Sequence, residues 1–248
     1  MSRAIADIDP GRLALLNQGK IASATLTEGL AIDFAVLLEA AVPVIGAARL
    51  EQLRAQADAG ITRRMALAAQ LLLDAGVDLA ALQAHPSDTV RGWVCFAIAA
   101  HAGLDLPQQL AAMRPLADDG HFGVREWAWL ALRPRLAAHL PQAIALLAPW
   151  TAQPSERLRR FACEALRPRG VWCTHIAELK QQPQLALPLL QPLRADPAVY
   201  VQDAVANWLN DAAKSQPDWV RTLCAQWLAE SPVAATARIC KRARRSLV

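Results

Sequence analysis

Apolar residues recur along most of the chain with the three-to-four residue spacing of an amphipathic helix. Several of these stretches share a similar start. The segments at Val90-Arg91-Gly92-Trp93, Val124-Arg125-Glu126-Trp127 and Leu158-Arg159-Arg160-Phe161 begin 34 residues apart. A fourth, Val201-Gln202-Asp203-Ala204, follows after 43 residues. This spacing predicts internal repeats, with an insertion between the third and the fourth.

Each of these segments is predicted to open a helix, because a residue that can cap a helix or form a turn lies just upstream. These upstream residues are Asp88, Asp119, Ser155 and Asp196. A second apolar, helix-like stretch precedes each segment, at Leu67–Leu73, Leu104–Ala112, Gln142–Ala148 and Leu185–Leu193. Prolines fall mainly near the inferred boundaries, where their missing N–H costs least.

Two helices per 34-residue unit are typical of an α-solenoid, in which each pair buries its apolar face against its neighbours. We therefore expect an all-α fold of stacked antiparallel helix pairs, forming a single domain over residues 1–248. The repeats are clear from about residue 63 to residue 248. Residues 1–60 are expected to be a less regular helical part.

Composition supports this fold class and narrows the setting. The chain is 54% hydrophobic, mostly Ala and Leu, with only 5% aromatic residues. The N-terminal sequence does not resemble a secretory signal, and no apolar run is long enough for a membrane span. The five cysteines form no C-x-x-C pair, so we expect small core residues rather than a disulfide framework or a zinc site. A reduced, cytoplasmic protein without a membrane partner is predicted.

Charge is unevenly distributed along the chain. Residues 1–124 carry a balance of −4, whereas residues 125–248 carry +8. A basic half suggests a polyanion partner. A solvated basic surface without a partner is the alternative, and charge alone does not separate the two.

Polar residues recur at positions i, i+4 and i+7 in the second helix of each pair, which places them on one face. If these helices line the inner surface of the solenoid, they form a groove of carboxylates, arginines, amides and tryptophan. The alternative is an ordinary wet face of an amphipathic helix. The stripe comprises Glu126, Trp129, Leu130, Arg133, Arg160, Glu164, Arg167, Asp203, Asn207, Asn210, Asp211 and Lys214.

At these residues the chain resembles the HEAT-repeat alkylpurine DNA glycosylases of the DNA alkylation repair family, particularly the AlkC-like branch. The resemblance is clear over roughly 85–245. It rests on the segments 121–134, 155–172 and 200–217, and most specifically on the strings R-P-R-x-x-W, ending at Trp172, and V-A-N-x-L-N-D, ending at Asp211.

The resemblance implies a HEAT-like solenoid that excises cationic alkylated purines, such as 3-methyladenine, from double-stranded DNA. It also implies no metal or organic cofactor. The catalytic carboxylates of the family fall on Glu126 and Asp211, and its site tryptophan falls on Trp172. We expect Asp211 to stabilise the developing sugar cation and position water, Glu126 to be the second carboxylate, and Trp172 to face the cationic base. The alternatives are an ion pair for each carboxylate and an aromatic cap on the core for Trp172.

Basic residues near the stripe are expected to hold DNA phosphates. They are Arg133, Arg160, Arg167, Arg169 and Lys214, with Lys241 and Arg244 from a second cluster near the C-terminus. Trp129, Glu164 and Asn207 are expected to line the groove. Histidines such as His85 and His121 lie near helix starts and are read as local hydrogen bonders.

No nucleotide-binding, zinc-protease or serine-hydrolase motif competes with this interpretation. Two further hypotheses stay open: a non-catalytic DNA-binding or damage-sensing solenoid, and a protein-interaction scaffold. A monomer is expected in each case.

Overall fold

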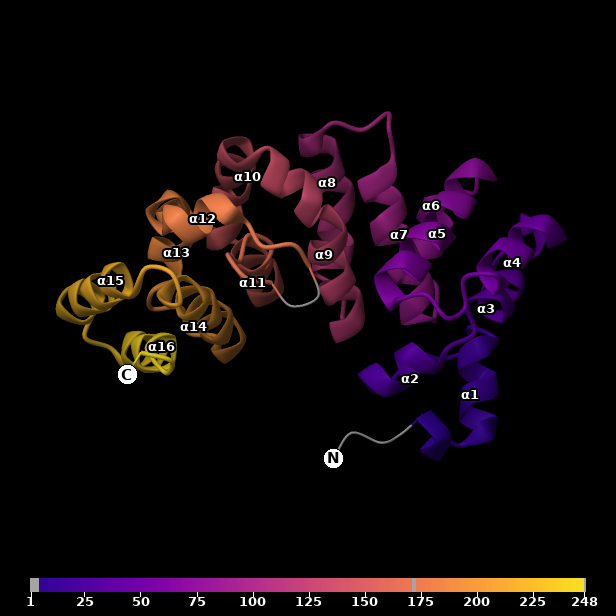
Figure 1. Cartoon of the computed structure of the whole chain (residues 1–248), viewed down its shortest axis with the longest axis horizontal. Coiled ribbons are helices and arrows are strands. Elements are labelled where there is room, and N and C mark those ends of the chain that lie inside the picture. The colour runs from indigo at the N-terminus through magenta and orange to yellow at the C-terminus, as the bar shows by residue number, and fades with distance from the viewer. Residues whose placement is uncertain (1–4, 171–172, 248) are drawn as a thin grey trace. The chain divides into compact units, whose positions relative to one another are not determined.

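The computed structural model describes residues 5–170 and 173–247. These residues form sixteen α-helices and five short 3-10 helices, and they contain no strand (Figure 1). The predicted all-α fold is therefore confirmed. The chain divides into two compact units, residues 1–131 and 132–248. That the whole chain acts as a single domain stays a prediction.

The first unit holds nine helices within its described residues, most of them short before residue 60. They are α1 (Pro10–Asn17), α2 (Leu26–Ala31), α3 (Phe34–Ala41), α4 (Ala47–Arg54), α5 (Ile61–Asp74), α6 (Leu79–Gln83), α7 (Asp88–Ala100), α8 (Leu106–Ala117) and α9 (Phe122–Ala138). The last of these runs on into the second unit. Two 3-10 turns, η1 (Ile5–Asp7) and η2 (Pro43–Ile45), complete it.

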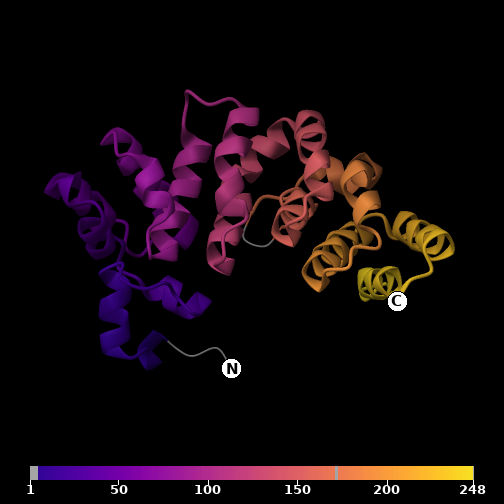
Figure 2. The same ribbon diagram turned by 180° about the vertical axis from the view of Figure 1, so that it is seen from behind.

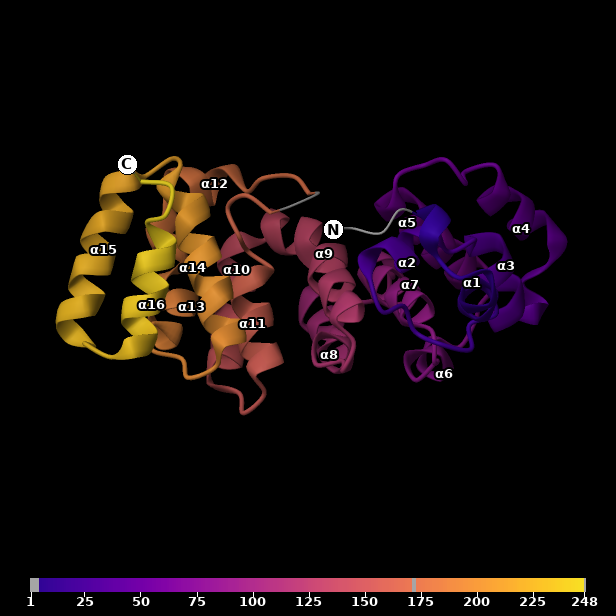
Figure 3. The ribbon, with the colours of Figure 1, turned by 90° about the horizontal axis from the view of Figure 1, so that it is seen from below.

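The second unit continues with further helices and with more 3-10 turns. Its elements are α10 (Leu140–Leu147), η3 (Ala148–Ala152), α11 (Glu156–Glu164), α12 (Ala177–Gln181), η4 (Pro183–Ala186), α13 (Leu187–Leu190), η5 (Gln191–Leu193), α14 (Val199–Ala213), α15 (Pro217–Glu230) and α16 (Ala234–Ala243). Helix α14 packs against both α11 and α16 (Figures 1 and 3). In the first unit α5 packs against α7, in the purple part of the ribbon seen from behind (Figure 2).

The predicted helix pairs are confirmed except for one member. Each of the four repeat segments opens a helix, at α7, α9, α11 and α14. The stretch Leu185–Leu193 was expected to be one helix, but it is divided between η4, α13 and η5. Pro188 and Pro192 explain the division, because neither can donate the backbone hydrogen bond that a continuous helix requires.

A recurring side chain at the start of each repeat ties the turn to its helix. Its nitrogen atoms donate to the carbonyl oxygens five and six positions earlier in the chain. These carbonyls lie in the turn before the helix, where backbone groups lack helical partners. The residues at this position are Arg91, Arg125, Arg159 and Gln202.

Two of these arginines also pair with an aspartate of the following repeat. Arg91 Nε lies 2.9 Å from Asp119, and Arg159 Nε lies 2.6 Å from Asp196. We call this series of contacts the arginine ladder. Each ladder aspartate accepts a further hydrogen bond from a backbone N–H two residues later. The 34-residue period therefore reflects a repeated polar clamp as well as a repeated apolar face.

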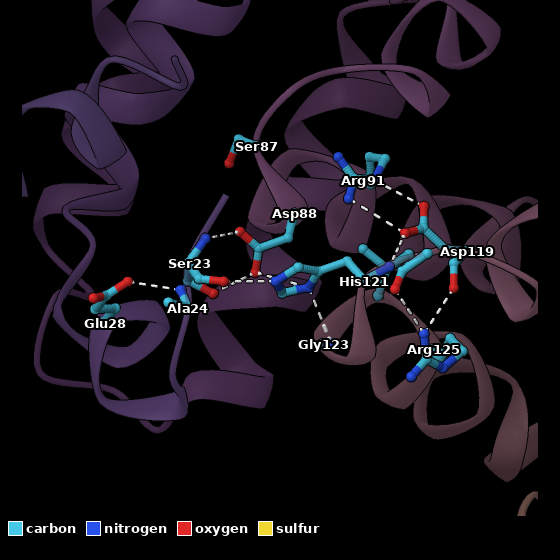
Figure 4. A network of polar contacts seen from close by, with 12 residues as sticks. Ser23, Ala24, Glu28, Ser87, Asp88, Arg91, Asp119, His121, Gly123 and Arg125 are labelled. Atoms are coloured by element: carbon cyan, nitrogen blue, oxygen red, sulfur yellow. Dashed lines mark hydrogen bonds and ion pairs between the residues drawn. The ribbon is translucent and has the colours of Figure 1, made fainter. Parts of the chain in front are cut away.

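The N-terminal segment is attached to the repeats through a buried carboxylate (Figure 4). Asp88 accepts hydrogen bonds from the backbone N–H and the hydroxyl of Ser23, at 2.8 and 2.7 Å. His121 lies beside it, with Nε2 2.6 Å from the Ser23 carbonyl and Nδ1 accepting from the Gly123 N–H. Asp88 was expected to cap α7, but Ser87 is the cap. His121 was expected to be a local hydrogen bonder; its contact with Gly123 is local, whereas its contact with Ser23 joins distant parts of the chain.

Helix packing buries the residues that the sequence marked as apolar. Four of the five cysteines are buried, Cys173 is partly exposed, and all five are free thiols. Within the described part of the chain, no helix is both long enough and apolar enough to cross a membrane.

Candidate functional site

Residues of the predicted site occur in both units, and each set is described within its own unit. In the second unit a buried group of charges joins α11 to α14. Arg167 donates to Asp211 Oδ2 through Nε at 2.9 Å and Nη2 at 2.7 Å. Its third nitrogen, Nη1, donates to Glu164 at 2.7 Å. Asp211 is 4% exposed and Glu164 is 3% exposed, so one guanidinium holds two buried carboxylates.

The charge state of this group follows from its geometry. Burial disfavours the charged guanidinium, but the carboxylates of Glu164 and Asp211 outweigh that cost, and the pKa of Arg167 is raised. Lys214 lies at the edge of the group, with Nζ 3.4 Å from Asp211 Oδ1, and its side chain is 48% exposed. Asp211 therefore has the ion-paired arrangement that the sequence left open as an alternative.

Arg133 has a structural position in the second unit. It is 2% exposed, and it donates to the backbone carbonyls of Ala165, Arg167 and Thr174. Burial lowers its pKa, and the charge of Arg167 adds to that effect. Because the Arg133 guanidinium is hydrogen-bonded to three carbonyls, it holds the loop after α11 and is buried rather than exposed at the surface. We therefore leave Arg133 out of the proposed DNA contacts.

A glycine permits this close packing. A β-carbon on Gly170 would lie 3.3 Å from the guanidinium carbon of Arg133 and would collide with the Cys173 sulfur. Burial raises the pKa of the Cys173 thiol, opposed by Arg133 and Arg167. The predicted site residue Trp172 lies outside the described residues.

Two more arginines of the predicted set contact residues that the sequence did not single out. The guanidinium of Arg160 lies 5.0 Å from the centre of the Tyr200 ring and 3.6 Å from Glu164. Arg169 donates to the Ser215 hydroxyl at 2.7 Å. Tyr200 is the single tyrosine of the chain, which is the only signal that could have marked it in advance.

The polar stripe of α14 faces another helix. Asp203 pairs with Arg238 and Arg242 of α16, at 2.8 and 3.0 Å. Asn210 donates to the carbonyl of Ala243 and to Ser246, at 3.0 and 2.6 Å. The mid-helix polar residues Asp203 and Asn210 thus anchor the last helix.

The groove-lining residue Asn207 belongs to the same contact. Its side-chain oxygen accepts a hydrogen bond from Arg245 at 2.9 Å. Near the C-terminus, Lys241 and Arg244 are exposed, together with Arg245.

In the first unit, Glu126 lies one turn into α9 and is partly exposed. Its Oε2 accepts a hydrogen bond of 2.7 Å from the indole N–H of Trp129. Three residues separate them, so both side chains project from the same face of the helix. The structure therefore pairs one predicted catalytic carboxylate with one predicted groove residue.

The described residues contain no cluster of three or more His, Cys, Asp or Glu side chains that could hold a metal ion. Each unit, taken by itself, offers carboxylates in a different setting. In the first unit Glu126 is partly exposed, whereas in the second unit Glu164 and Asp211 are buried around Arg167. A carboxylate can stabilise a developing positive charge or orient a water molecule.

The repeat architecture defines a class of protein. Residues 79–167 match the HEAT repeats, which confirms the solenoid prediction. The more particular resemblance is confirmed as well, because residues 124–238 match the family of DNA alkylation repair enzymes. This span contains Glu126, Glu164, Arg167 and Asp211.

Individual relatives agree with that assignment. Among solved structures, the Pseudomonas fluorescens alkylpurine DNA glycosylase AlkC, bound to DNA containing an abasic site analog, is 26% identical with a TM-score of 0.70. The match covers 100% of this chain and 65% of AlkC. AlkD2 from Streptococcus mutans is 19% identical over 86% of this chain and 96% of its own, with a TM-score of 0.58, and shows the shared fold.

A curated relative, the uncharacterized protein YhaZ of Bacillus subtilis strain 168, is 39% identical over 77 residues. That match covers 31% of this chain and 21% of YhaZ. The chain thus spans about a fifth of YhaZ and just under two thirds of AlkC.

Proposed function

We propose that this protein is a DNA glycosylase that excises cationic alkylated purines from duplex DNA. The observation that carries the proposal is the match of the whole chain to AlkC at 26% identity, supported by the family match over residues 124–238. AlkC is described as an alkylpurine DNA glycosylase and was captured on DNA with an abasic site analog.

The chemistry suits a site built from carboxylates. An alkylated purine already carries a positive charge and leaves readily, so the barrier lies in the oxocarbenium-like sugar. A carboxylate next to that sugar stabilises charge that exists only in the transition state, and it can also orient the attacking water. Glu126 is partly exposed, which supports a role in direct contact with the sugar or water.

Asp211 and Trp172 keep their proposed roles of charge stabiliser and cation-facing wall. For Asp211 the burial and the ion pair with Arg167 set a condition: the pair must open, or Lys214 must swing away, before the carboxylate reaches a substrate. Lys214 is the more exposed of its two partners. A phosphate that draws Lys214 toward itself would uncover Asp211 Oδ1, and this makes Lys214 a proposed link between DNA binding and the site.

For DNA binding we propose Lys214, Lys241 and Arg244 as the main phosphate contacts, because these three are exposed. The proposed set also keeps three less exposed arginines, each of which contacts another side chain of the protein. They are Arg160, Arg167 and Arg169. A cytoplasmic monomer acting without a metal or organic cofactor completes the proposal.

A base-release assay tests the proposal. Duplex DNA treated with a methylating agent is incubated with the protein, and freed purines are separated by chromatography. We expect the wild-type chain to release methylated purine, and Glu126→Gln to lower the single-turnover rate by roughly 10²- to 10³-fold. Failure of the wild-type chain to release any base at high enzyme concentration would overturn the proposal.

A matched pair of variants separates the role of Asp211 from its ion pair. Asp211→Asn and Glu164→Gln each neutralise one buried carboxylate on Arg167, so both should lower stability similarly. We expect only Asp211→Asn to abolish base release under conditions where both variants are folded by circular dichroism. A larger loss in Glu164→Gln would assign the role to Glu164.

One observation favours a second candidate function. Because Asp211 is ion-paired and buried, a non-catalytic DNA-binding solenoid also fits the second unit. This function predicts salt-sensitive duplex binding without base release. A protein-interaction scaffold predicts no duplex binding and no base release.

A further inference from the structure

Trp129 has a polar partner of a different kind from those of the buried tryptophans Trp208 and Trp227. Its side chain is 5% exposed, and its N–H donates to the carboxylate of Glu126 at 2.7 Å. Trp208 and Trp227 direct the same N–H group to neutral oxygens, the Leu166 carbonyl and the Gln191 amide. A buried indole N–H needs an acceptor, but nothing in its packing requires that the acceptor be charged.

The contact constrains the carboxylate more than the tryptophan. The indole is buried, whereas Glu126 is a partly exposed side chain with three rotatable bonds. A charge-assisted hydrogen bond from a packed donor favours one rotamer of a more flexible partner.

We propose that Trp129 is a positioning residue: its indole N–H fixes the Glu126 carboxylate in the orientation used for base excision. The inference rests on the proposed function and deepens it. Trp129 itself touches no reacting atom, and its effect on the reaction passes through Glu126. Preorganisation of this kind matters because a misplaced catalytic group loses much of its transition-state stabilisation.

The experiment compares Trp129→Phe with the matched control Trp227→Phe. Both remove an indole N–H from a buried tryptophan, but only the first removes it from a carboxylate. In single-turnover base release we expect Trp129→Phe to lower the maximal rate roughly 10- to 100-fold with little change in DNA affinity. Trp227→Phe is expected to keep the wild-type rate.

A double variant then tests whether the effect passes through Glu126. In a Glu126→Gln background, Trp129→Phe should cause no further loss of rate, because the group it positions is already gone. An independent loss of the same size in both backgrounds would indicate a packing role and overturn the inference. So would a wild-type rate in Trp129→Phe.

A readout without substrate separates this inference from the proposed function. The indole ¹⁵N–¹H signal of Trp129 should shift in Glu126→Gln, whereas the signal of Trp227 should not. If that shift occurs but the wild-type chain releases no base, then the proposed function fails and with it the catalytic role of the contact. If the wild-type chain releases base and the signal does not shift, only the positioning inference fails.

Discussion

At the scale of single residues, arginine side chains account for most of the difference between the expected and the observed site. A surface phosphate contact and a buried carbonyl clamp both favour arginine, because its planar group offers five N–H donors in fixed directions. Arg133 shows the second use, since it holds three carbonyls. Arg167 shows a third, since it holds two buried carboxylates.

The buried position of Arg167 leads to a stability prediction. Arg167→Met should lower the free energy of unfolding by about 3–5 kcal/mol, because it leaves two buried carboxylates without their cation. Urea denaturation followed by circular dichroism would measure this.

Arg221→Ala serves as the control for Arg167→Met. Arg221 belongs to an exposed ion pair with Asp218, and its removal should change stability by well under 1 kcal/mol. Equal stability of the two variants would contradict the buried-cluster interpretation.

Site residues were less predictable than the fold for a physical reason. The sequence predicted that the stripe on the second helices lies on one face, but spacing does not reveal which neighbour covers each residue of the stripe. Asp203 and Asn210 were placed in a groove, whereas they anchor α16. The Glu126–Trp129 pair lies within one helix turn, so its proximity followed directly from helical spacing.

At the scale of elements, the helix pairs were predictable because two independent signals coincided. Apolar spacing marked the helices, and the 34-residue period marked the turns. The prediction of one helix from Leu185 to Leu193 was wrong, because Pro188 and Pro192 interrupt the apolar stretch on which it rested.

The arginine ladder gives a prediction at this scale. Arg159 clamps a turn and pairs with the buried Asp196, so Arg159→Ala should cost roughly 2–4 kcal/mol of unfolding free energy. Arg159→Gln should cost clearly less, because Gln202 already holds the corresponding two carbonyls in the next repeat. Thermal and urea unfolding would rank the three proteins. Identical losses in both variants would show that the turn carbonyls contribute little.

At the scale of the whole molecule, the uneven distribution of charge along the chain is the feature that could be read most directly from the sequence. The excess of basic residues lies after residue 124, and several of the exposed cations belong to the second unit. However, several arginines in that half, such as Arg133 and Arg167, are hydrogen-bonded to other groups of the protein. The net charge of a segment therefore overstates the charge that a partner meets.

Salt dependence tests which cations remain available. Replacing both Lys241 and Arg244 with Ala should weaken binding to unmodified duplex DNA and reduce the slope of log affinity against log salt by about two. Fluorescence anisotropy across a salt series measures both quantities.

The control for the salt series is Arg54→Ala, which removes an exposed arginine from the first unit. It should leave the slope unchanged. A slope that falls equally in the control would mean that binding follows overall charge and not the C-terminal cluster.

The arginine ladder also decides how the chain could be rearranged by engineering. The acid that completes the contact of Arg159 is Asp196, which belongs to the following repeat, as Asp119 does for Arg91. A module excised at the helix boundaries would therefore lose half of each contact and carry an orphaned guanidinium. Exchange of modules between such proteins should cut after the turn aspartate, so that each arginine and the acid that pairs with it stay in one module.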